Sequence, residues 1–417
     1  EASGASRDDV RAMARLYADA RRVIVCWCMG LTQHPNAVAN VQEIVNLVLL
    51  RGNIGVPGAG VCPVRGHSNV QGDRTMGITS RPDPAFLERL GREFGFEPPR
   101  RPGLDAVDAI RAMADGRIRA FLSMGGNFAV ATPDAELTHA ALRRCALTVQ
   151  ISTTLNRSHL VCGEEAILLP CLGRTERDEQ ALGLQTVSVE NSMSVVHPSR
   201  GSREPASAHL HSEPAIVAGL ARAVLGNESR VPWEELVEDY DRIRERIAAV
   251  VPGCEDMNLR LRQPGGFVLP SGARTRSFDT PSGKASFTVH PVPPDPLQDG
   301  QFLLMTIRSH DQFNTTVYSP DDRHRGIRGD RRVILLNGDD LAETGLREGQ
   351  RVDVTSHHDG RTRTLRGFRI RVYDLPRRCA AAYFPEANPL VPVDRVADRS
   401  QTPAYKNLVV SLAPSGA

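Results

Sequence analysis

The chain has 417 residues, of which 41% are hydrophobic and 24% are charged, and its formal net charge is +2. This length is enough for about two or three domains with buried cores, and the composition is that of an ordinary globular protein. No apolar run approaches the roughly 18 residues that a membrane-spanning helix needs, and no basic block is interleaved with aromatic residues. The composition therefore excludes a membrane-spanning protein and disfavours nucleic acid as a partner.

Lysine and cysteine are used unevenly. The 51 basic residues include only two lysines, Lys284 and Lys406, so a lysine in so arginine-rich a chain is expected to have a specific role. The eight cysteines contain no C-x-x-C pair and no zinc-type spacing with histidine. We expect most of them to be buried, to bind no metal, and to reflect a reducing, cytoplasmic location.

The first part of the chain predicts a strand between two helices. Apolar residues recur at helical spacing over 9–21, and VIVCW (23–27) is a continuous apolar run typical of a buried parallel strand. A second helix is predicted over 37–52, where a broad apolar stripe ends at Gly52. The polar turn LTQHPN follows the strand, at the end where open α/β sheets bind ligands.

A glycine-rich stretch, GVPGAGVCPVRGHSNVQGDRTMG, runs from Gly55 to Gly77 without helical or strand periodicity. Its six glycines are interspersed with polar side chains such as Arg65 and His67, and only glycine lets a backbone approach a ligand with no Cβ between them. We therefore expect an irregular functional loop that lies against a large polar ligand. A plain surface loop is the alternative, whereas the apolar residues of the stretch argue against disorder.

The middle of the chain repeats the order strand, turn, helix. Helices are predicted over 105–116, 213–225 and 233–250, and strands over 118–124, 146–152 and 166–170. Thr132 precedes Pro133 and two acidic residues, which is the pattern of a helix N-cap. The repeated order indicates a doubly wound, Rossmann-like α/β region that extends to about residue 225.

The last third of the chain has a different sequence pattern. A hairpin is expected over 277–289, centred on Pro281-Ser282-Gly283, and a proline-rich linker follows over 291–296. Short alternating strands are then predicted over 302–307, 331–336, 350–356, 362–373 and 407–412, with one helix over 338–344. This pattern predicts a separate, mostly antiparallel β-barrel domain at the C-terminal end.

Polar turns follow several of the predicted strands: MGLTQ (29–33), PVRGHSNVQGD (63–73), MGGN (124–127) and RSHDQFNT (308–315). Backbone donors combined with Arg, Asn and Gln suit an extended, phosphate-bearing cofactor, although each turn alone is better explained as a loop whose polar groups satisfy one another. The chain has no Walker loop, nucleophile elbow or H-E-x-x-H motif. It also lacks the glycine fingerprint of a nicotinamide dehydrogenase, which disfavours that class.

Five ordered motifs together resemble one family. GNIGVPGAGVCPVRGHSNVQGDRTMG, CMGLTQH, TIRSHDQFNTT, YFPEANPLVP and TPAYKNLVV are similar to motifs of the molybdopterin-dependent oxidoreductases of the dimethyl sulfoxide reductase superfamily, in particular the catalytic (alpha) subunit of formate dehydrogenases. The resemblance covers essentially the whole chain. It implies a bis-molybdopterin guanine dinucleotide with molybdenum, bound between two α/β domains and a C-terminal barrel. The implied boundaries are 1–66 and 67–290 for the α/β domains and 297–417 for the dinucleotide-binding barrel.

The resemblance also implies the residues of the site. The positions that correspond to cofactor-binding positions are Met29, Gln33, Gly66, Asn127, Thr132, Cys171, Arg308, Gln312, Asn314, Asn388 and Lys406. Arg65 matches the family's active-site arginine, whose planar guanidinium can hold a carboxylate through two hydrogen bonds; a loop brace between Arg65 and Asp73 is the alternative. His67 stands where formate dehydrogenases typically carry Gln, so this chain has a titratable ring where the family has an amide.

The implied activity is a two-electron oxidation or reduction of a small substrate, formate or a similar small anion, with an electron-transfer partner. In this family the 4Fe-4S cysteines and the protein ligand of molybdenum lie in an N-terminal region that should precede Glu1. Cys26 and Cys28 are not expected to replace them, because they fall in a predicted buried strand and lack cluster spacing. The alternative hypothesis is a non-catalytic module that binds the cofactor or a partner.

Overall fold

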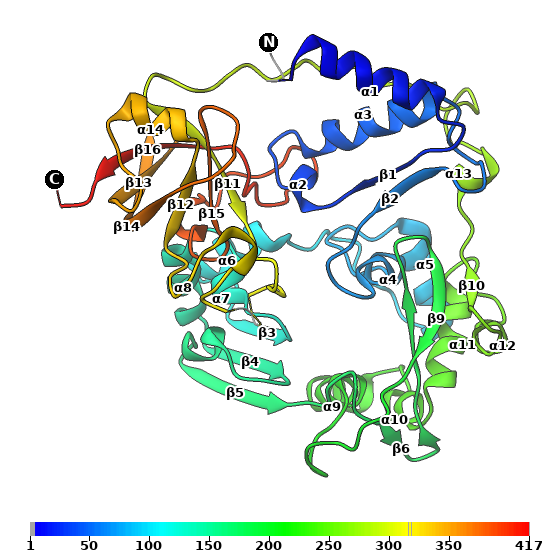
Figure 1. The fold of residues 1–417 in the computed structure, drawn as a ribbon. Helices are drawn as coiled ribbons and strands as arrows, with labels where there is room; N and C mark the ends of the chain where they lie inside the picture. The colour runs from blue at the N-terminus through cyan, green and yellow to red at the C-terminus, as the bar shows by residue number, and fades with distance from the viewer. Residues whose placement is uncertain (1–4, 316, 318, 417) are drawn as a thin grey trace.

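The computed structural model describes residues 5–315, 317 and 319–416. Figure 1 shows four groups of elements that follow one another in a ring, so that the C-terminal barrel lies beside the N-terminal group. Backbone hydrogen bonds from Lys406 N–H to the Gln33 carbonyl (2.9 Å) and from Asp398 N–H to the Pro35 carbonyl (2.8 Å) join the two. The ring thereby places the turn after the first strand against the last segment of the chain.

The N-terminal group contains α1 (Arg7–Asp19), β1 (Ile24–Trp27), α2 (Met29–Thr32), α3 (Ala37–Leu50) and β2 (Gly60–Pro63). Among the described strands, β1 pairs only with β2, in parallel. The expectation of a buried strand is wrong here, since Ile24 is 48% exposed and Cys26 and Cys28 are exposed too. The physical reason is that α1 and α3 lie on one side of this two-stranded sheet (Figure 1), which leaves its other face open.

The glycine-rich stretch is not wholly irregular, which corrects the sequence-based expectation. It contains β2 and a short helix, α4 (Val70–Thr75). Asn69 adopts a left-handed conformation (φ 68°) and its Oδ1 accepts a hydrogen bond from Glu190 N–H at 2.9 Å. A Cβ at Gly72 would lie 2.1 Å from that same Oδ1, so glycine is required where α4 packs against Asn69. Residues 64–68 remain without regular structure.

The second α/β group has a parallel sheet of β3 (Ala120–Met124), β4 (Leu147–Ser152) and β5 (Glu165–Pro170), packed with α6 (Ala106–Ala114), α7 (Phe128–Ala131) and α8 (Ala135–Arg143). The predicted N-cap is wrong, because Thr132 ends α7 and Asp134 precedes α8. Proline disfavours helical backbone in the residue before it, and Thr132 is extended (ψ 157°). Asp134 is then fixed from the barrel, with its N–H donating to the Val391 carbonyl (2.9 Å) and its carboxylate bound to Arg363 (2.5 Å).

Helices and a small antiparallel sheet form the third group. They are α5 (Pro84–Phe94), α9 (Glu213–Leu225), α10 (Trp233–Glu238), α11 (Tyr240–Val250), α12 (Met257–Leu261), β8 (Val187–Glu190), β9 (Val195–Ser199) and β10 (Phe267–Val268). The helix predicted over 233–250 is interrupted at Asp239, which is extended (φ −150°) and caps α11 by accepting from Asp241 N–H at 2.9 Å.

The expected hairpin over 277–289 does not form. Its turn closes, with Gly283 N–H donating to the Thr280 carbonyl at 2.9 Å. The second limb instead pairs with a side chain of α3, because Asn46 donates to the Thr288 carbonyl (2.7 Å) and accepts from Thr288 N–H (3.1 Å). The shorter elements of the chain are β6 (Glu179–Gln180), β7 (Gly183–Leu184), α13 (Gly272–Thr275), η1 (Arg157–Leu160), η2 (Gly226–Glu228), η3 (Arg323–Arg325) and η4 (Asn388–Leu390).

A closed barrel ends the chain, as the sequence predicted. Its strands are, in spatial order, β11 (Gln301–Ile307), β15 (Cys379–Tyr383), β12 (Val333–Leu336), β14 (Arg361–Val372), β13 (Arg351–His358) and β16 (Leu408–Pro414), with α14 (Gly338–Thr344) beside them. The pairs β11–β15 and β12–β14 are parallel and the other four pairs are antiparallel. Leu304, Ile334, Val352 and Phe368 are fully buried in its core. The α/β class with a mostly antiparallel barrel is therefore confirmed.

Candidate functional site

The segment that follows β11, residues 308–315, joins three parts of the molecule and is called the 308–315 loop below. Its Arg308 lies within electrostatic reach of Cys28, next to α2. Its Asn314 Nδ2 is 3.0 Å from Nε2 of His67 in the glycine-rich stretch. The carbonyl of Thr315 accepts from Asn127 Nδ2 at 3.2 Å. The other three polar turns singled out in the sequence thus lie around this one loop.

A cluster of cations lies where the barrel meets α2, formed by Arg308, Arg395 and Lys406. Lys406 is 8% exposed, and its Nζ donates to the carbonyl and, at 3.2 Å, to the hydroxyl of Thr306. Arg395 donates to three backbone carbonyls, including that of Lys406 at 2.9 Å. Within the described chain, no carboxylate forms an ion pair with any of the three. We call them the cation cluster.

Burial without a counter-charge dominates the electrostatics of the cation cluster. Burial, followed by repulsion from Arg308, lowers the pKa of Lys406 to about 8. Burial lowers the pKa of Arg395 to about 10, and it also lowers the pKa of Arg308. The nearby His34 has its pKa lowered by burial first and then by Lys406 and Arg395. Unpaired buried charge is costly, so this arrangement favours a bound anion such as a phosphate group.

Met29 and Gln33, both predicted to bind the cofactor, lie beside the cation cluster. α2 brings them one turn apart, with Gln33 Nε2 donating to the Met29 sulfur at 3.7 Å. The Gln33 carbonyl accepts from Lys406 N–H at 2.9 Å. His34 holds the turn through a 2.7 Å contact between Nε2 and the Gly30 carbonyl. The structure therefore brings Met29, Gln33, Arg308 and Lys406 together.

Arg65, Gly66 and His67 form an exposed corner of the glycine-rich stretch. Arg65 Nη2 donates to Gln71 Oε1 at 3.0 Å; the alternative of a brace to Asp73 is not seen. The Gln71 amide is neutral, so this hydrogen bond does not compensate the charge of the Arg65 guanidinium. At the next residue, Gly66, a Cβ would meet nothing within 4 Å. The His67 ring is held by Asn314 and by an edge contact with Phe313, with ring centroids 5.4 Å apart.

Arg65 lines two hollows. The first, of about 240 Å³, lies between the corner formed by residues 65–70 and the β8–β9 hairpin, which contributes Glu190, Ser192 and His197. The second, of about 490 Å³, is lined by Gly55–Gly60 together with Gln71, Ser194 and Arg274. A Cβ at Gly58 or Gly60 would make only ordinary contacts, at 3.5 Å and 3.7 Å, whereas a Cβ at Gly55 would lie 2.6 Å from Cγ of Arg276, so the chain itself covers part of this backbone.

Two other predicted residues use their side chains within the protein. Asn127 is 5% exposed, and its Oδ1 accepts from Ser158 Oγ at 2.7 Å while its Nδ2 holds Thr315. Gln312 Nε2 donates to the carbonyls of Asn314 (2.7 Å) and Phe384 (2.8 Å). These contacts fix the position of the 308–315 loop.

Three further predicted residues lie apart from the cation cluster. The Thr132 hydroxyl donates to the Phe128 carbonyl at 2.8 Å, inside its own helix end. Asn388, 1% exposed, donates to the Val130 carbonyl at 2.8 Å and joins η4 to α7, while its Oδ1 is buried without a partner. Cys171 is buried directly after β5, where its backbone forms an isolated β-bridge with His211. Burial, and then the charges of Glu213 and Glu176, raise the pKa of its thiol.

The sequence did not single out Arg331, which organises the 308–315 loop from within. It is 7% exposed, and its guanidinium donates to Glu386 Oε1 (2.8 Å), Ser309 Oγ (2.9 Å) and Gln312 Oε1 (2.8 Å). The arginine-rich composition around 321–332 concealed it, because one buried arginine among exposed ones leaves no periodic signal. The one sequence feature that could have indicated a buried arginine is its acidic partner, Glu386, within the motif YFPEANPLVP.

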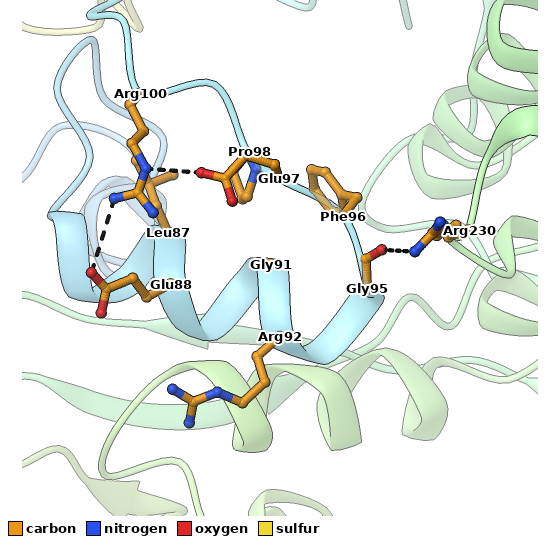
Figure 2. A pocket seen from close by; sticks show the side chains of 10 residues that line it. All are labelled: Leu87, Glu88, Gly91, Arg92, Gly95, Phe96, Glu97, Pro98, Arg100 and Arg230. Carbon is orange, nitrogen blue, oxygen red and sulfur yellow. Dashed lines mark hydrogen bonds and ion pairs between the residues drawn. The ribbon is translucent and has the colours of Figure 1, made fainter.

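Figure 2 shows a separate pocket on α5, of about 630 Å³, lined by Glu88, Arg92, Glu97, Arg100 and Arg230 among others. Arg100 pairs with Glu97 at 2.9 Å and lies 3.9 Å from Glu88, and Arg230 donates to the Gly95 carbonyl. None of the predicted site residues lines it. Most of its charge is satisfied locally, so it forms no part of the candidate site.

The described residues contain no group of three or more His, Cys, Asp or Glu side chains placed to hold a metal ion. None of their helices is both long enough and apolar enough to cross a membrane.

The fold joins α/β elements to a closed β-barrel, and the cation cluster lies where the barrel meets α2. Residues 11–204 match the family described as molybdopterin oxidoreductase, and residues 302–409 match the molydopterin dinucleotide binding domain. The chain belongs to the molybdopterin-dependent oxidoreductases of the dimethyl sulfoxide reductase superfamily, and molybdenum bis-molybdopterin guanine dinucleotide is the cofactor of these domains.

Individual relatives agree with this family. An uncharacterized oxidoreductase of Mycobacterium tuberculosis is 53% identical over 421 residues, which is 100% of this chain and 54% of that protein. The F420-dependent formate dehydrogenase 1 subunit alpha of Methanococcus maripaludis is 23% identical over 85% of this chain and 52% of that protein. The acetylene hydratase from Pelobacter acetylenicus shares the fold, with a TM-score of 0.65 at 15% identity over 99% of this chain and 63% of that chain. The chain thus spans about half the length of these sequence relatives.

The described residues fit such a cofactor. A dinucleotide of this kind carries phosphates, and the cation cluster offers buried positive charge that no carboxylate neutralises. Guanidinium and ammonium groups in a desolvated site are the usual partners of phosphate oxygens. The hollow of about 490 Å³ beside Gly55–Gly60 offers room for part of a bulky ring system.

Proposed function

We propose that the protein carrying this chain is a molybdopterin oxidoreductase of the formate dehydrogenase type, which oxidises or reduces a small anion by two electrons. One observation supports the proposal most: the Arg65 guanidinium is exposed, has the neutral amide of Gln71 as its one partner among the described residues, and lines the small hollow that His67 shares. A hollow of about 240 Å³ suits a substrate of few atoms. Formate is the first candidate because a relative bears the name formate dehydrogenase.

Arg65 has the chemistry for holding a carboxylate. Its guanidinium stays charged when water is excluded, and its parallel N–H groups match two carboxylate oxygens. The hydrogen bond to Gln71 fixes the side chain without neutralising it. Arg65 therefore orients the substrate's reacting C–H bond, while the cofactor, when bound, supplies the molybdenum that exchanges the electron pair.

His67 is proposed as the proton-handling group of the site. Asn314 and Phe313 hold its ring at the edge of the same hollow. Imidazole can accept and release a proton near neutral pH, whereas an amide cannot. A proton lost on two-electron oxidation of a C–H bond would then pass to His67.

The cofactor-binding roles are proposed in two groups. Arg308, Arg395 and Lys406, with Met29 and Gln33, would hold the phosphates and the neighbouring part of one dinucleotide. The residues Gly66, Asn127, Thr132, Cys171, Gln312, Asn314 and Asn388 would contribute through contact or through shaping the loops. The three domain boundaries, an iron–sulfur cluster, an electron-transfer partner and a cytoplasmic location complete the proposal.

The test is substrate-dependent reduction of the purified, oxidised protein. Formate, nitrate and acetate are added separately, and the molybdenum signal is followed by electron paramagnetic resonance and by total metal content. Formate-dependent reduction with molybdenum near stoichiometric is the expected result. Molybdenum without a response to formate removes formate as the substrate and keeps the family. Protein fully active without molybdenum contradicts the proposed chemistry altogether.

A further inference from the structure

Cys26 and Cys62 face each other across the two-stranded sheet. β1 and β2 run in parallel with Cys26 directly opposite Cys62, between the pairs Val25–Val61 and Trp27–Pro63. Directly paired residues of neighbouring strands point to the same face of the sheet. This register places the two thiols side by side, and burial first, and then the charge of Cys26 and a hydrogen bond with it, raise the pKa of the Cys62 thiol.

The backbone spacing matches that of a disulfide. Adjacent strands lie about 4.7–4.9 Å apart, and disulfides join Cα atoms about 4.4–6.8 Å apart. The pair is also accessible, since Cys26 is exposed, Cys62 is half-buried, and Ile24 on the same face is 48% exposed. By contrast, Cys145, Cys171 and Cys254 are buried.

We infer that Cys26 and Cys62 form a thiol pair that reacts with low-molecular-weight disulfides to give an intramolecular disulfide. The thiolate of one cysteine attacks the reagent's S–S bond, forms a mixed disulfide and releases one thiol. The second cysteine then attacks the protein sulfur of that mixed disulfide and releases the second thiol. The protein pair loses two electrons and the reagent gains them as two thiols.

The consequence concerns the position of the candidate site. β1 leads into Met29–Thr32 and β2 leads into Arg65. A covalent bond between the strands one residue before their ends fixes these two segments relative to each other. This inference does not depend on the proposed function, because the pair is defined by the register of the sheet.

Cys28 provides a matched control. It is exposed and lies two residues beyond Cys26, but β1 has ended at Trp27, so Cys28 has no opposite residue in β2. Its electrostatic neighbours are Arg308 and Lys406. If exposure alone governed reactivity, Cys28 would form a disulfide with Cys62 as readily as Cys26 does.

The experiment treats the reduced, folded chain with oxidised glutathione, blocks remaining thiols with N-ethylmaleimide, and maps tryptic peptides without reduction. Cleavage after Arg22, Arg51 and Arg65 leaves Cys26 and Cys28 in the peptide 23–51 and Cys62 in the peptide 52–65. The expected product is these two peptides joined by a disulfide, with fragment ions that assign Cys26.

Single variants decide the assignment. Cys28→Ser should leave the yield of linked peptide within about twofold, and Cys26→Ser should abolish it, with circular dichroism confirming that both fold. A linked peptide that persists in Cys26→Ser would overturn the inference. So would the absence of a linked peptide in the folded wild-type chain when the urea-unfolded chain forms mixed disulfides normally.

Discussion

Asn314 Nδ2 lies 3.0 Å from His67 Nε2, although the two residues are 247 positions apart in the chain. The contact joins the barrel's 308–315 loop to the glycine-rich stretch, so the ring that faces the small hollow is oriented from another domain. Gln312 and Arg331 in turn fix that loop from beneath. The orientation of the proposed proton acceptor thus depends on the docking of the barrel.

Replacing Asn314 should affect turnover more than cofactor binding. Asn314→Ala removes the hydrogen bond that holds the His67 ring, and misplacing a reacting group typically costs about tenfold to a hundredfold in rate. We expect kcat to fall by that factor while molybdenum content stays near the wild-type level. Steady-state kinetics with metal analysis measures both. Asn46→Ala, which removes a contact between α3 and Thr288, is the control and should leave kcat unchanged.

Lys406 should have opposite effects on stability and on cofactor binding. In the cofactor-free chain, burial lowers its pKa from 10.5 to about 8. Below pH 8 both folded and unfolded chains carry the proton, so the folded chain bears the full cost of a buried charge. Between about pH 8 and 10.5 the unfolded chain binds the proton more tightly, so stability rises with pH, by about 3 kcal/mol at most.

Lys406→Met should therefore raise the unfolding free energy of the cofactor-free chain at pH 7, by about 1–3 kcal/mol. The same variant should retain less molybdopterin dinucleotide, because it removes a phosphate partner. Urea unfolding and pterin quantification measure the two effects. Lys284→Met changes the only other lysine, which is exposed, and should alter neither. A loss of stability in Lys406→Met at pH 7 would show that the ammonium is not a buried, uncompensated charge.

Arg331 should be needed for stability. Its removal in Arg331→Met leaves Glu386, which it contacts at 2.8 Å, as a poorly solvated and unpaired carboxylate. Breaking such a pair costs about 3–5 kcal/mol. The double variant Arg331→Met/Glu386→Gln should recover part of this loss in urea unfolding. Arg332→Met, at the exposed neighbouring position, is the control and should change stability by less than about 0.5 kcal/mol. An equal loss in the single and double variants would exclude the unpaired carboxylate as the cause.

Local signals predicted much of the fold. The alternating strands of the barrel and the helix over 213–225 depend on patterns within a few residues, and they formed where expected. β15 was missed because CAAAY contains three alanines, which favour strands poorly, although all three are buried.

Long-range pairing explains what the sequence concealed. No local pattern indicates that β1 has β2 as its one partner among the described strands. Cys26 is exposed because the sheet is only these two strands wide, and that depends on pairing between segments distant in the chain. The hairpin over 277–289 failed because Asn46 pairs with the backbone of Thr288. For the site, motifs identified the residues that surround the 308–315 loop, but Arg331 and Arg395 were indistinguishable from the many exposed arginines.

The proposed binding of the substrate anion by Arg65 is tested by comparing Arg65→Lys with Arg74→Lys in the same stretch. Lysine keeps the charge but loses the paired N–H geometry. We expect Arg65→Lys to lower formate-dependent molybdenum reduction by about a hundredfold or more, with wild-type molybdenum content, and Arg74→Lys to behave as wild type. Unchanged reduction in Arg65→Lys, or a parallel loss of molybdenum and activity, would contradict it.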